Sequence, residues 1–289
     1  MIDLNDLLVK VDLDPRKVMV MRHRPTEKDL RRVMPWLAAD RPEVYNAYQC
    51  NHGETVETSL SKATHLVSFI GHEPRRAVLV GVYAVNGYQK ISAAEFWERP
   101  HNSTLRTLGT KGPKNERASL WFDLRLSEHL QSLKGRLVIE WTGSERSWWR
   151  WASRNTLPVH AIHEESLLVQ TLPSWDALVL SWEELQMLPP SWKQALAQWR
   201  GVYFIYDKTA RMGYVGSAYG ADNLMGRWTN YAVTGHGGNR LLRSRNPEDF
   251  VYSILQRVSP DMDGDEVIAI ENSWKERLHT RTPLGFNDN

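Results

Sequence analysis

The sequence has few of the features that would place it outside a reducing compartment. Its 289 residues include a single cysteine, Cys50, which excludes an internal disulfide. No run approaches the ~20 apolar residues that a membrane span needs. The opening stretch, MIDLNDLLVKVDLD, carries acidic side chains and lacks the basic start and apolar core of a secretory signal. We therefore expect a cytoplasmic protein without a membrane partner.

The sequence also lacks a strong excess of either charge. The formal net charge is +2, which neither favours nor excludes binding to a nucleic acid. Residues 201–289 hold ten Lys and Arg against eleven Asp and Glu, so the positive surplus lies in the first 200 residues. If DNA is the partner, the N-terminal region is expected to supply much of the phosphate contact.

The length favours two domains over one. Pro189 and Pro190 cannot continue a helix, while Ser191 is a good cap for a new one. We therefore predict a substrate-recognition domain over 1–190, a linker over 191–200 and a second domain over 201–289. Patterning in the first domain predicts a mixed, mainly β structure of α+β class, such as a small curved sheet or barrel, with strands at 17–21, 65–70, 76–83, 120–124, 137–141 and 159–162 and helices at 26–37 and 43–49.

The second domain opens with a pair of tyrosine-glycine tripeptides. Gly201-Val202-Tyr203 begins an alternating segment, which predicts a half-buried strand with Tyr203 on the face opposite Val202, so that Tyr203 need not be core. After a loop at 207–213 comes Tyr214-Val215-Gly216. Pairing of the two strands would bring both tyrosine hydroxyls into one shallow site, although tyrosine pairs in hairpins also serve as plain packing residues.

Three further elements follow the tripeptides. A helix predicted at 222–231 places Arg227 and Tyr231 four residues apart on one face, from which both could reach the same phosphate. A strand is predicted at 250–258 and a helix at 263–281. On that last helix Glu271 lies at the margin of the apolar stripe, which would fix a lone carboxylate at a cleft, but Glu271 could also pair with Lys275.

Together with Asn287 near the end of the sequence, this order of residues resembles the GIY-YIG nuclease family. The resemblance covers residues 201–289 and implies a small three-stranded antiparallel sheet flanked by helices. It implies metal-dependent hydrolysis of a phosphodiester with Mg²⁺ or Mn²⁺, Glu271 being the sole protein ligand of the metal. It further implies Tyr203 as general base helped by Tyr214, Arg227 on the scissile phosphate supported by Tyr231, and Asn287 fixing the site. Asn287 could instead be a chain-end cap.

His236 is a further catalytic candidate because its flanking glycines would let the backbone approach a phosphate. His236 could equally be a surface histidine in a glycine-rich turn, without a catalytic role. The leading functional hypothesis is a DNA endonuclease in restriction or defence against foreign or modified DNA, acting as a homodimer if both strands are cut. RNA is not excluded as a partner. The alternatives are a repair or mobile-element nuclease, and a non-catalytic nucleic-acid reader.

The first domain contains one cluster of basic and aromatic residues. As a helix, residues 141–154 would place three arginines on one face and two tryptophans on another, an arrangement suited to phosphate contact beside a stacking platform. The candidates for nucleic-acid binding are Arg146, Trp148, Arg150, Trp151 and Arg154. Alternatively the tryptophans pack the domain and the arginines are solvated. Residues 69–83 are similar to barrel modules of the PUA or EVE type, which implies recognition of modified bases.

Overall fold

The computed structural model describes residues 2–113, 117–144, 146–169, 171–220 and 223–288. The chain divides into two compact units, residues 1–170 and 171–289. The division lies ahead of the linker predicted at 191–200 because strand β8 (Val179–Ser181) pairs with strand β11 (Phe250–Arg257) of the second unit. Within the described residues, no helix combines the length and the apolar character that crossing a bilayer requires.

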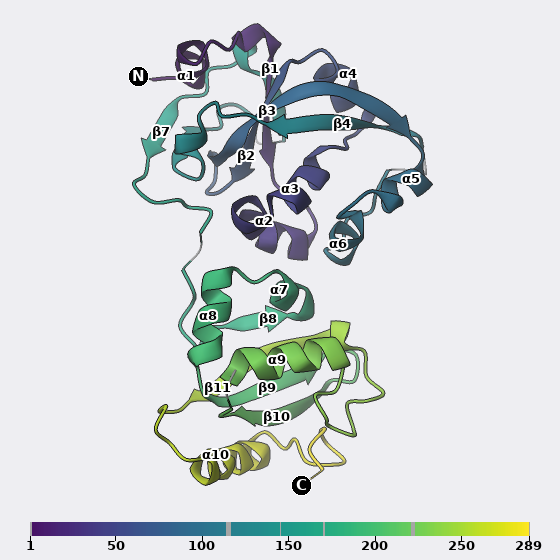
Figure 1. The fold of residues 1–289 in the computed structure, drawn as a ribbon, viewed down its shortest axis with the longest axis vertical. Coiled ribbons are helices and arrows are strands. Elements are labelled where there is room, and N and C mark those ends of the chain that lie inside the picture. Colours follow the sequence, from purple (N-terminus) through teal and green to yellow (C-terminus); the bar gives the residue numbers. More distant parts are fainter. Residues whose placement is uncertain (1, 114–116, 145, 170, 221–222, 289) are drawn as a thin grey trace. The chain divides into compact units, whose positions relative to one another are not determined.

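The first unit is built on one mixed sheet (Figure 1). Its seven strands follow the path β6-β1-β2-β3-β5-β7, with β4 added beside β3. The strands are β1 (Val18–His23), β2 (His65–Gly71), β3 (Arg76–Ile91), β4 (Ser119–Leu126), β5 (Leu137–Glu140), β6 (Trp149–Trp151) and β7 (Val159–Ile162). The helices are α1 (Leu4–Lys10), α2 (Lys28–Asp40), α3 (Pro42–Gln49), α4 (Glu54–Leu60), α5 (Ala93–Glu98) and α6 (Asn102–Thr107).

Strand β3 organises this sheet. Its start pairs with β5 and its second half pairs with β4, so two strands share one side of it. β1 and β2 are parallel, and every residue of β1 is buried, as expected for a strand covered on both faces. The predicted strands and the two predicted helices all form, and the short helices α5 and α6 form between β3 and β4.

The predicted helix at 141–154 is wrong. Residues 149–151 form strand β6, which pairs antiparallel with β1 and sets Arg150 opposite Val20. In a strand, neighbouring side chains alternate between two faces, so the arginines do not share one helical face. Arg150 is buried, and its guanidinium carbon lies 4.5 Å from the centre of the Trp141 ring. Arg146 and Arg154 are exposed.

The second unit contains a four-stranded antiparallel sheet in the order β10-β9-β11-β8 (Figure 1). The family resemblance implies three strands, and β8 is the fourth. The further strands are β9 (Gly201–Asp207) and β10 (Met212–Ala218), and the helices are α7 (Trp182–Met187), α8 (Pro190–Gln198), α9 (Asn223–Thr234) and α10 (Gly264–Arg277). Asp222, expected to begin α9, lies outside the described residues. α9 and α10 both contact β9 and β10.

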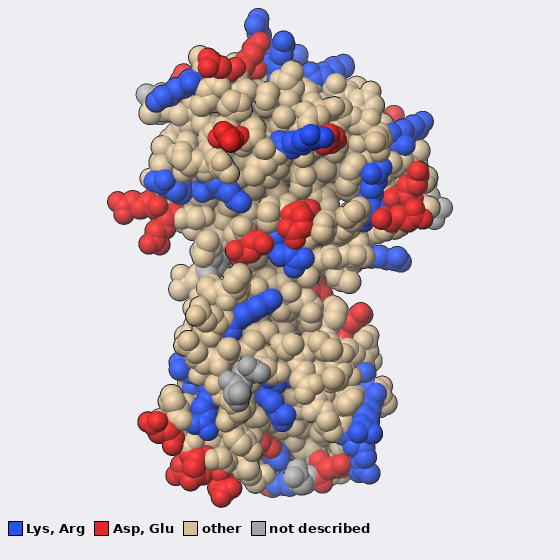
Figure 2. All heavy atoms as spheres, viewed as in Figure 1, with Lys and Arg blue, Asp and Glu red and all other residues tan. Residues whose placement is uncertain are grey.

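On the face shown in Figure 2, Lys and Arg side chains are interspersed with Asp and Glu on each unit. This mixture agrees with the small net charge. A broad surface of one sign is not seen among the described residues of that face.

Candidate active site in the second unit

The two tyrosine tripeptides come together through the register of the β9-β10 hairpin. Gly216 lies opposite Tyr203, and Tyr214 lies two residues away on the same face of β10. The ring centroids of Tyr203 and Tyr214 are 6.4 Å apart. A Cβ at position 216 would lie 2.5 Å from the Tyr203 hydroxyl oxygen and 2.9 Å from the Tyr214 ring. The glycine is therefore required so that both rings can lie over the strand.

Tyr203 itself is fully buried, contrary to the expectation that it need not be core. Helices α9 and α10 both contact β9, so the alternation of its side chains does not leave Tyr203 exposed. The Tyr203 ring packs against Trp228 and Tyr231 of α9, with centroid distances of 6.5 and 6.1 Å. Burial raises the pKa of the Tyr203 phenol well above its usual value.

Helix α9 carries Arg227 and Tyr231. Because they are four residues apart, both lie on the face of the helix toward β9. The Tyr203 hydroxyl donates to the Tyr231 hydroxyl oxygen at 3.4 Å, and the Tyr231 ring centroid lies 5.7 Å from that of Tyr214. Arg227 is exposed and its positive charge acts on the Tyr203 phenol. The three tyrosines thus form one aromatic cluster with a cation at its solvent side.

Helix α10 supplies Glu271. Its Oε1 lies 2.7 Å from the Lys275 ammonium, and its Oε2 accepts a hydrogen bond from the Ser217 hydroxyl of β10. The Lys275 side chain is only 4% exposed and that of Glu271 13% exposed. The ion pair that the four-residue spacing suggests is therefore formed, and both partners are held in place by the packing of α10 on the sheet.

These groups meet in a cleft of about 470 Å³ at the edge strand β10. Tyr214 and Ser217 are three residues apart on β10 and so project to opposite faces, where they meet α9 and α10 respectively. The cleft is lined by Tyr214, Ser217, Tyr219, Gly220, Arg227, Ile268, Glu271, Asn272 and Lys275. Tyr203 and Tyr231 are not among the lining residues and lie behind Tyr214.

Asn287 and His236 have local partners that account for their positions. The Asn287 Oδ1 accepts from the Val215 N–H at 3.0 Å, and its Nδ2 donates to the Val215 carbonyl at 2.8 Å. The side chain therefore ties the C-terminal segment to the strand that carries Tyr214. His236 accepts from the Gly238 N–H at 2.9 Å through Nδ1, and a Cβ at Gly237 would lie 2.6 Å from the Tyr231 ring. The glycine loop thus approaches a tyrosine.

The basic and aromatic candidates of the first unit are dispersed. Arg150 donates to the Ser144 carbonyl at 3.1 Å, and Trp151 is half-buried in β6. Trp148 lines a pocket of the first unit together with Tyr48 and Phe96. Ser217 was not singled out from the sequence. Its signal would have been its position on the β10 face opposite Tyr214, which can be recognised only once α10 is known to pack there.

Comparison with known proteins gives a limited result. No family model matches, and no curated protein matches. Among solved structures, the catalytic domain of the homing endonuclease I-TevI is similar with 25% identity and a TM-score of 0.27, over 31% of this chain and 98% of that chain. A mutant of the catalytic domain of intron endonuclease I-TevI matches with 22% identity and a TM-score of 0.27, over 32% of this chain and 95% of that chain. A TM-score this low supports no argument about activity.

Proposed function

We propose that the protein is a metal-dependent DNA endonuclease that hydrolyses phosphodiester bonds in the β10 cleft. The observation that carries the proposal is the convergence of Tyr214, Arg227 and Glu271 in one cleft from three separate elements. A phenol, a guanidinium and a carboxylate provide a proton acceptor, a phosphate contact and a metal ligand, which are the groups that phosphodiester hydrolysis requires.

The cleft has a donor set that suits Mg²⁺ or Mn²⁺. Mg²⁺ usually binds through one or two carboxylates and keeps waters and substrate phosphates in its other positions. Glu271 is one such carboxylate, and its two oxygens have more acceptor sites than Lys275 and Ser217 use. Glu271 is the one carboxylate among the described residues that line the cleft, so we assign it as the sole protein ligand. A bound ion would stabilise charge on the leaving oxygen.

The protein side chains then have separate tasks. Arg227, exposed at the cleft, binds the scissile phosphate and neutralises charge on it as the attacking water approaches. Tyr214 is the tyrosine that faces the cleft and accepts the proton of that water. Tyr203 and Tyr231 hold the Tyr214 ring in place through the aromatic cluster. Lys275 orients the Glu271 carboxylate.

A cleavage assay tests this proposal. With Mg²⁺, the purified protein is expected to convert supercoiled plasmid into nicked and then linear product, and Glu271→Ala to abolish both. Glu276→Ala is the matched control, because Glu276 is exposed on the same helix and pairs with Arg281. Intact DNA and RNA substrates with both the wild type and Glu271→Ala would refute the enzyme and favour a non-catalytic reader.

Within this activity we favour restriction or defence over repair or a mobile-element role. Each chain has one such cleft among its described residues, and one cleft cuts one strand at a time. Cutting both strands would thus require a homodimer or two successive nicks. Comparing cleavage of unmodified plasmid with plasmid that carries methylated or hydroxymethylated bases tests the defence role, and equal cleavage of all would remove the modified-base part.

A further inference from the structure

Lys275 of α10 is a buried cation at the cleft of the second unit. Its side chain is only 4% exposed, yet the residue is among those that line the cleft. A buried ammonium is stable only where it is paired and hydrogen-bonded. The Lys275 Nζ lies 2.7 Å from Glu271 Oε1 and donates to Asn272 Oδ1 at 3.3 Å. The carboxylate that we assign to the metal is therefore already paired with a cation of the protein itself.

The second oxygen of this carboxylate also has a partner. The Ser217 hydroxyl of β10 donates to Glu271 Oε2. Ser217 is buried and Glu271 is half-buried, so the two contacts hold the carboxylate in one orientation. A divalent ion that binds Glu271 has to share the carboxylate with both partners, and the positive charge of Lys275 opposes it.

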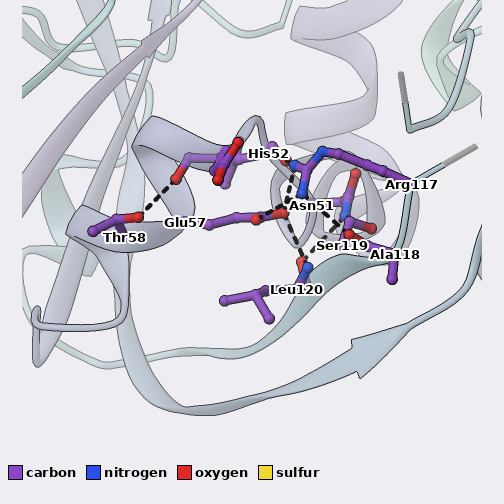
Figure 3. A network of polar contacts seen from close by, with 9 residues as sticks. Asn51, His52, Glu57, Thr58, Arg117, Ala118, Ser119 and Leu120 are labelled. Carbon is purple, nitrogen blue, oxygen red and sulfur yellow. Dashed lines mark hydrogen bonds and ion pairs between the residues drawn. The ribbon is translucent and has the colours of Figure 1, made fainter. Parts of the chain in front are cut away.

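A buried carboxylate of the first unit, Glu57 of α4, is held in a different way (Figure 3). Arg117 donates to its Oε1 at 2.9 Å and to its Oε2 at 3.1 Å, and the Leu120 N–H donates to Oε1 at 3.0 Å. A guanidinium fork of this kind occupies both oxygens in a fixed geometry, whereas an ammonium is a point charge on a flexible stem. Lys275 therefore neutralises Glu271 without enclosing it, and Glu271 still lines the cleft.

The charges around the cleft also disfavour a divalent cation in the free protein. Among the described residues that line it, Arg227 and Lys275 are cations and Glu271 is the one carboxylate. This surplus of positive charge repels an added dication. Mg²⁺ usually takes part of its coordination from substrate phosphates, and the phosphates of bound DNA would supply the negative charge that the cleft itself lacks.

We infer that Lys275 sets the metal affinity of the cleft. It is a positioning residue that neutralises and orients Glu271 in the free protein and weakens the binding of a divalent ion there. Without the charge of Lys275, Glu271 would bind the ion with less opposition. The inference rests on the proposed function, because it takes Glu271 as the metal ligand. It adds the residue that decides how much Mg²⁺ or Mn²⁺ the protein requires.

Metal binding measured without DNA tests the inference. Lys275→Met keeps a long, flexible side chain and removes its charge. Calorimetric titration of the full-length protein with Mn²⁺ should give a dissociation constant about tenfold lower for Lys275→Met than for the wild type. In EDTA the variant should unfold at a lower temperature, because Glu271 loses its partner. Mn²⁺ should then raise the unfolding temperature of the variant more than that of the wild type.

Further variants separate metal binding from packing. Arg117→Met removes the cation from Glu57 and should also lower the unfolding temperature, but Mn²⁺ should not restore it, because Glu57 is enclosed (Figure 3). Adding Glu271→Gln to Lys275→Met should abolish the gain in Mn²⁺ affinity. Lys275→Gln, whose neutral amide can still donate to Glu271, provides the same measurement if Lys275→Met does not fold.

The outcomes distinguish this inference from the nuclease proposal. An unchanged Mn²⁺ affinity in the neutral variants of Lys275, or a gain that survives Glu271→Gln, would overturn the inference. If the wild type nevertheless cuts plasmid with Mg²⁺, the nuclease proposal stands without it. A tenfold gain in Mn²⁺ affinity in a protein whose wild type cuts no DNA or RNA would support the role of Lys275 and refute the nuclease.

Discussion

At the scale of single residues, Tyr203, Tyr214 and Tyr231 of the aromatic cluster have the same phenol group but differ in burial, and therefore in role. Tyr203 is fully buried, whereas Tyr214 is half-buried and lines the cleft. Burial raises the pKa of the Tyr214 phenol and the charge of Arg227 partly opposes this rise. A phenol that accepts a proton must first be ionised, and its ionised fraction grows as the pH approaches its pKa from below.

The cleavage rate is therefore expected to rise about tenfold per pH unit through neutrality and up to pH ~10, as expected for a base whose pKa lies above this range. Tyr214→Phe should lower the rate by roughly 10²–10⁴-fold and remove the slope. Tyr203→Phe should cost only about tenfold and keep the slope, because its hydroxyl contacts Tyr231 rather than the cleft. Single-turnover cleavage across the pH range gives both quantities, and a slope lost in Tyr203→Phe but kept in Tyr214→Phe would reverse the assignment.

Two histidines of the first unit, the buried His23 and the half-buried His52, make its stability sensitive to acid. Burial lowers the pKa of His23 to about 3 and that of His52 to about 4, from 6.5. The unfolded chain then binds protons that the folded protein does not, so stability is full above pH ~6.5 and falls as the pH drops toward 3. Unfolding temperatures between pH 7 and 4, followed by tryptophan fluorescence, should decline less steeply in His23→Gln than in the control His163→Gln, an exposed histidine. Parallel declines in the two variants would contradict this origin.

At the scale of elements, the C-terminal segment completes the edge of the sheet. β10 is an edge strand, and the Asn287 side chain pairs with both backbone polar groups of Val215 as a neighbouring strand would. Asn287 is 2% exposed, so its removal would leave Val215 without these partners. We expect Asn287→Ala to lower the free energy of unfolding by about 1–3 kcal/mol in urea titrations. Asn230→Ala, at an exposed position of α9, should change it little, and equal stabilities would show that the edge is closed by other contacts.

The same elements show which parts of the fold could be predicted from the sequence alone. Alternation and glycine positions predicted β9, β10, α9 and α10, because these segments have strong local periodicity. The three-residue strands β6 and β8 were missed, because their pairing with β1 and β11 depends on contacts distant in the sequence. The burial of Tyr203 was missed for a related reason: a strand's own pattern does not say which helices will cover it.

At the scale of the whole molecule, the net charge is too small to attract DNA strongly, so we expect phosphate binding to depend on local clusters of cations. Residues 201–289 have no excess of basic residues. One pocket of the first unit, called the cationic pocket, is lined by Arg24, Lys28, Arg31 and Arg32, and we expect it to contribute strongly to DNA affinity. Removing one phosphate-binding cation should reduce the slope of log affinity against log salt by about 0.9. Arg31→Ala and Lys28→Ala should each do so by about that amount for a short labelled DNA duplex.

Lys62→Ala, which removes an exposed positive charge of the first unit outside the cationic pocket, is the control for nonspecific electrostatics. Fluorescence anisotropy titrations of the duplex at several salt concentrations measure this slope. If Lys62→Ala lowers the slope as much as Arg31→Ala does, DNA affinity comes from the diffuse charge of the surface, and the cationic pocket has no special part in it.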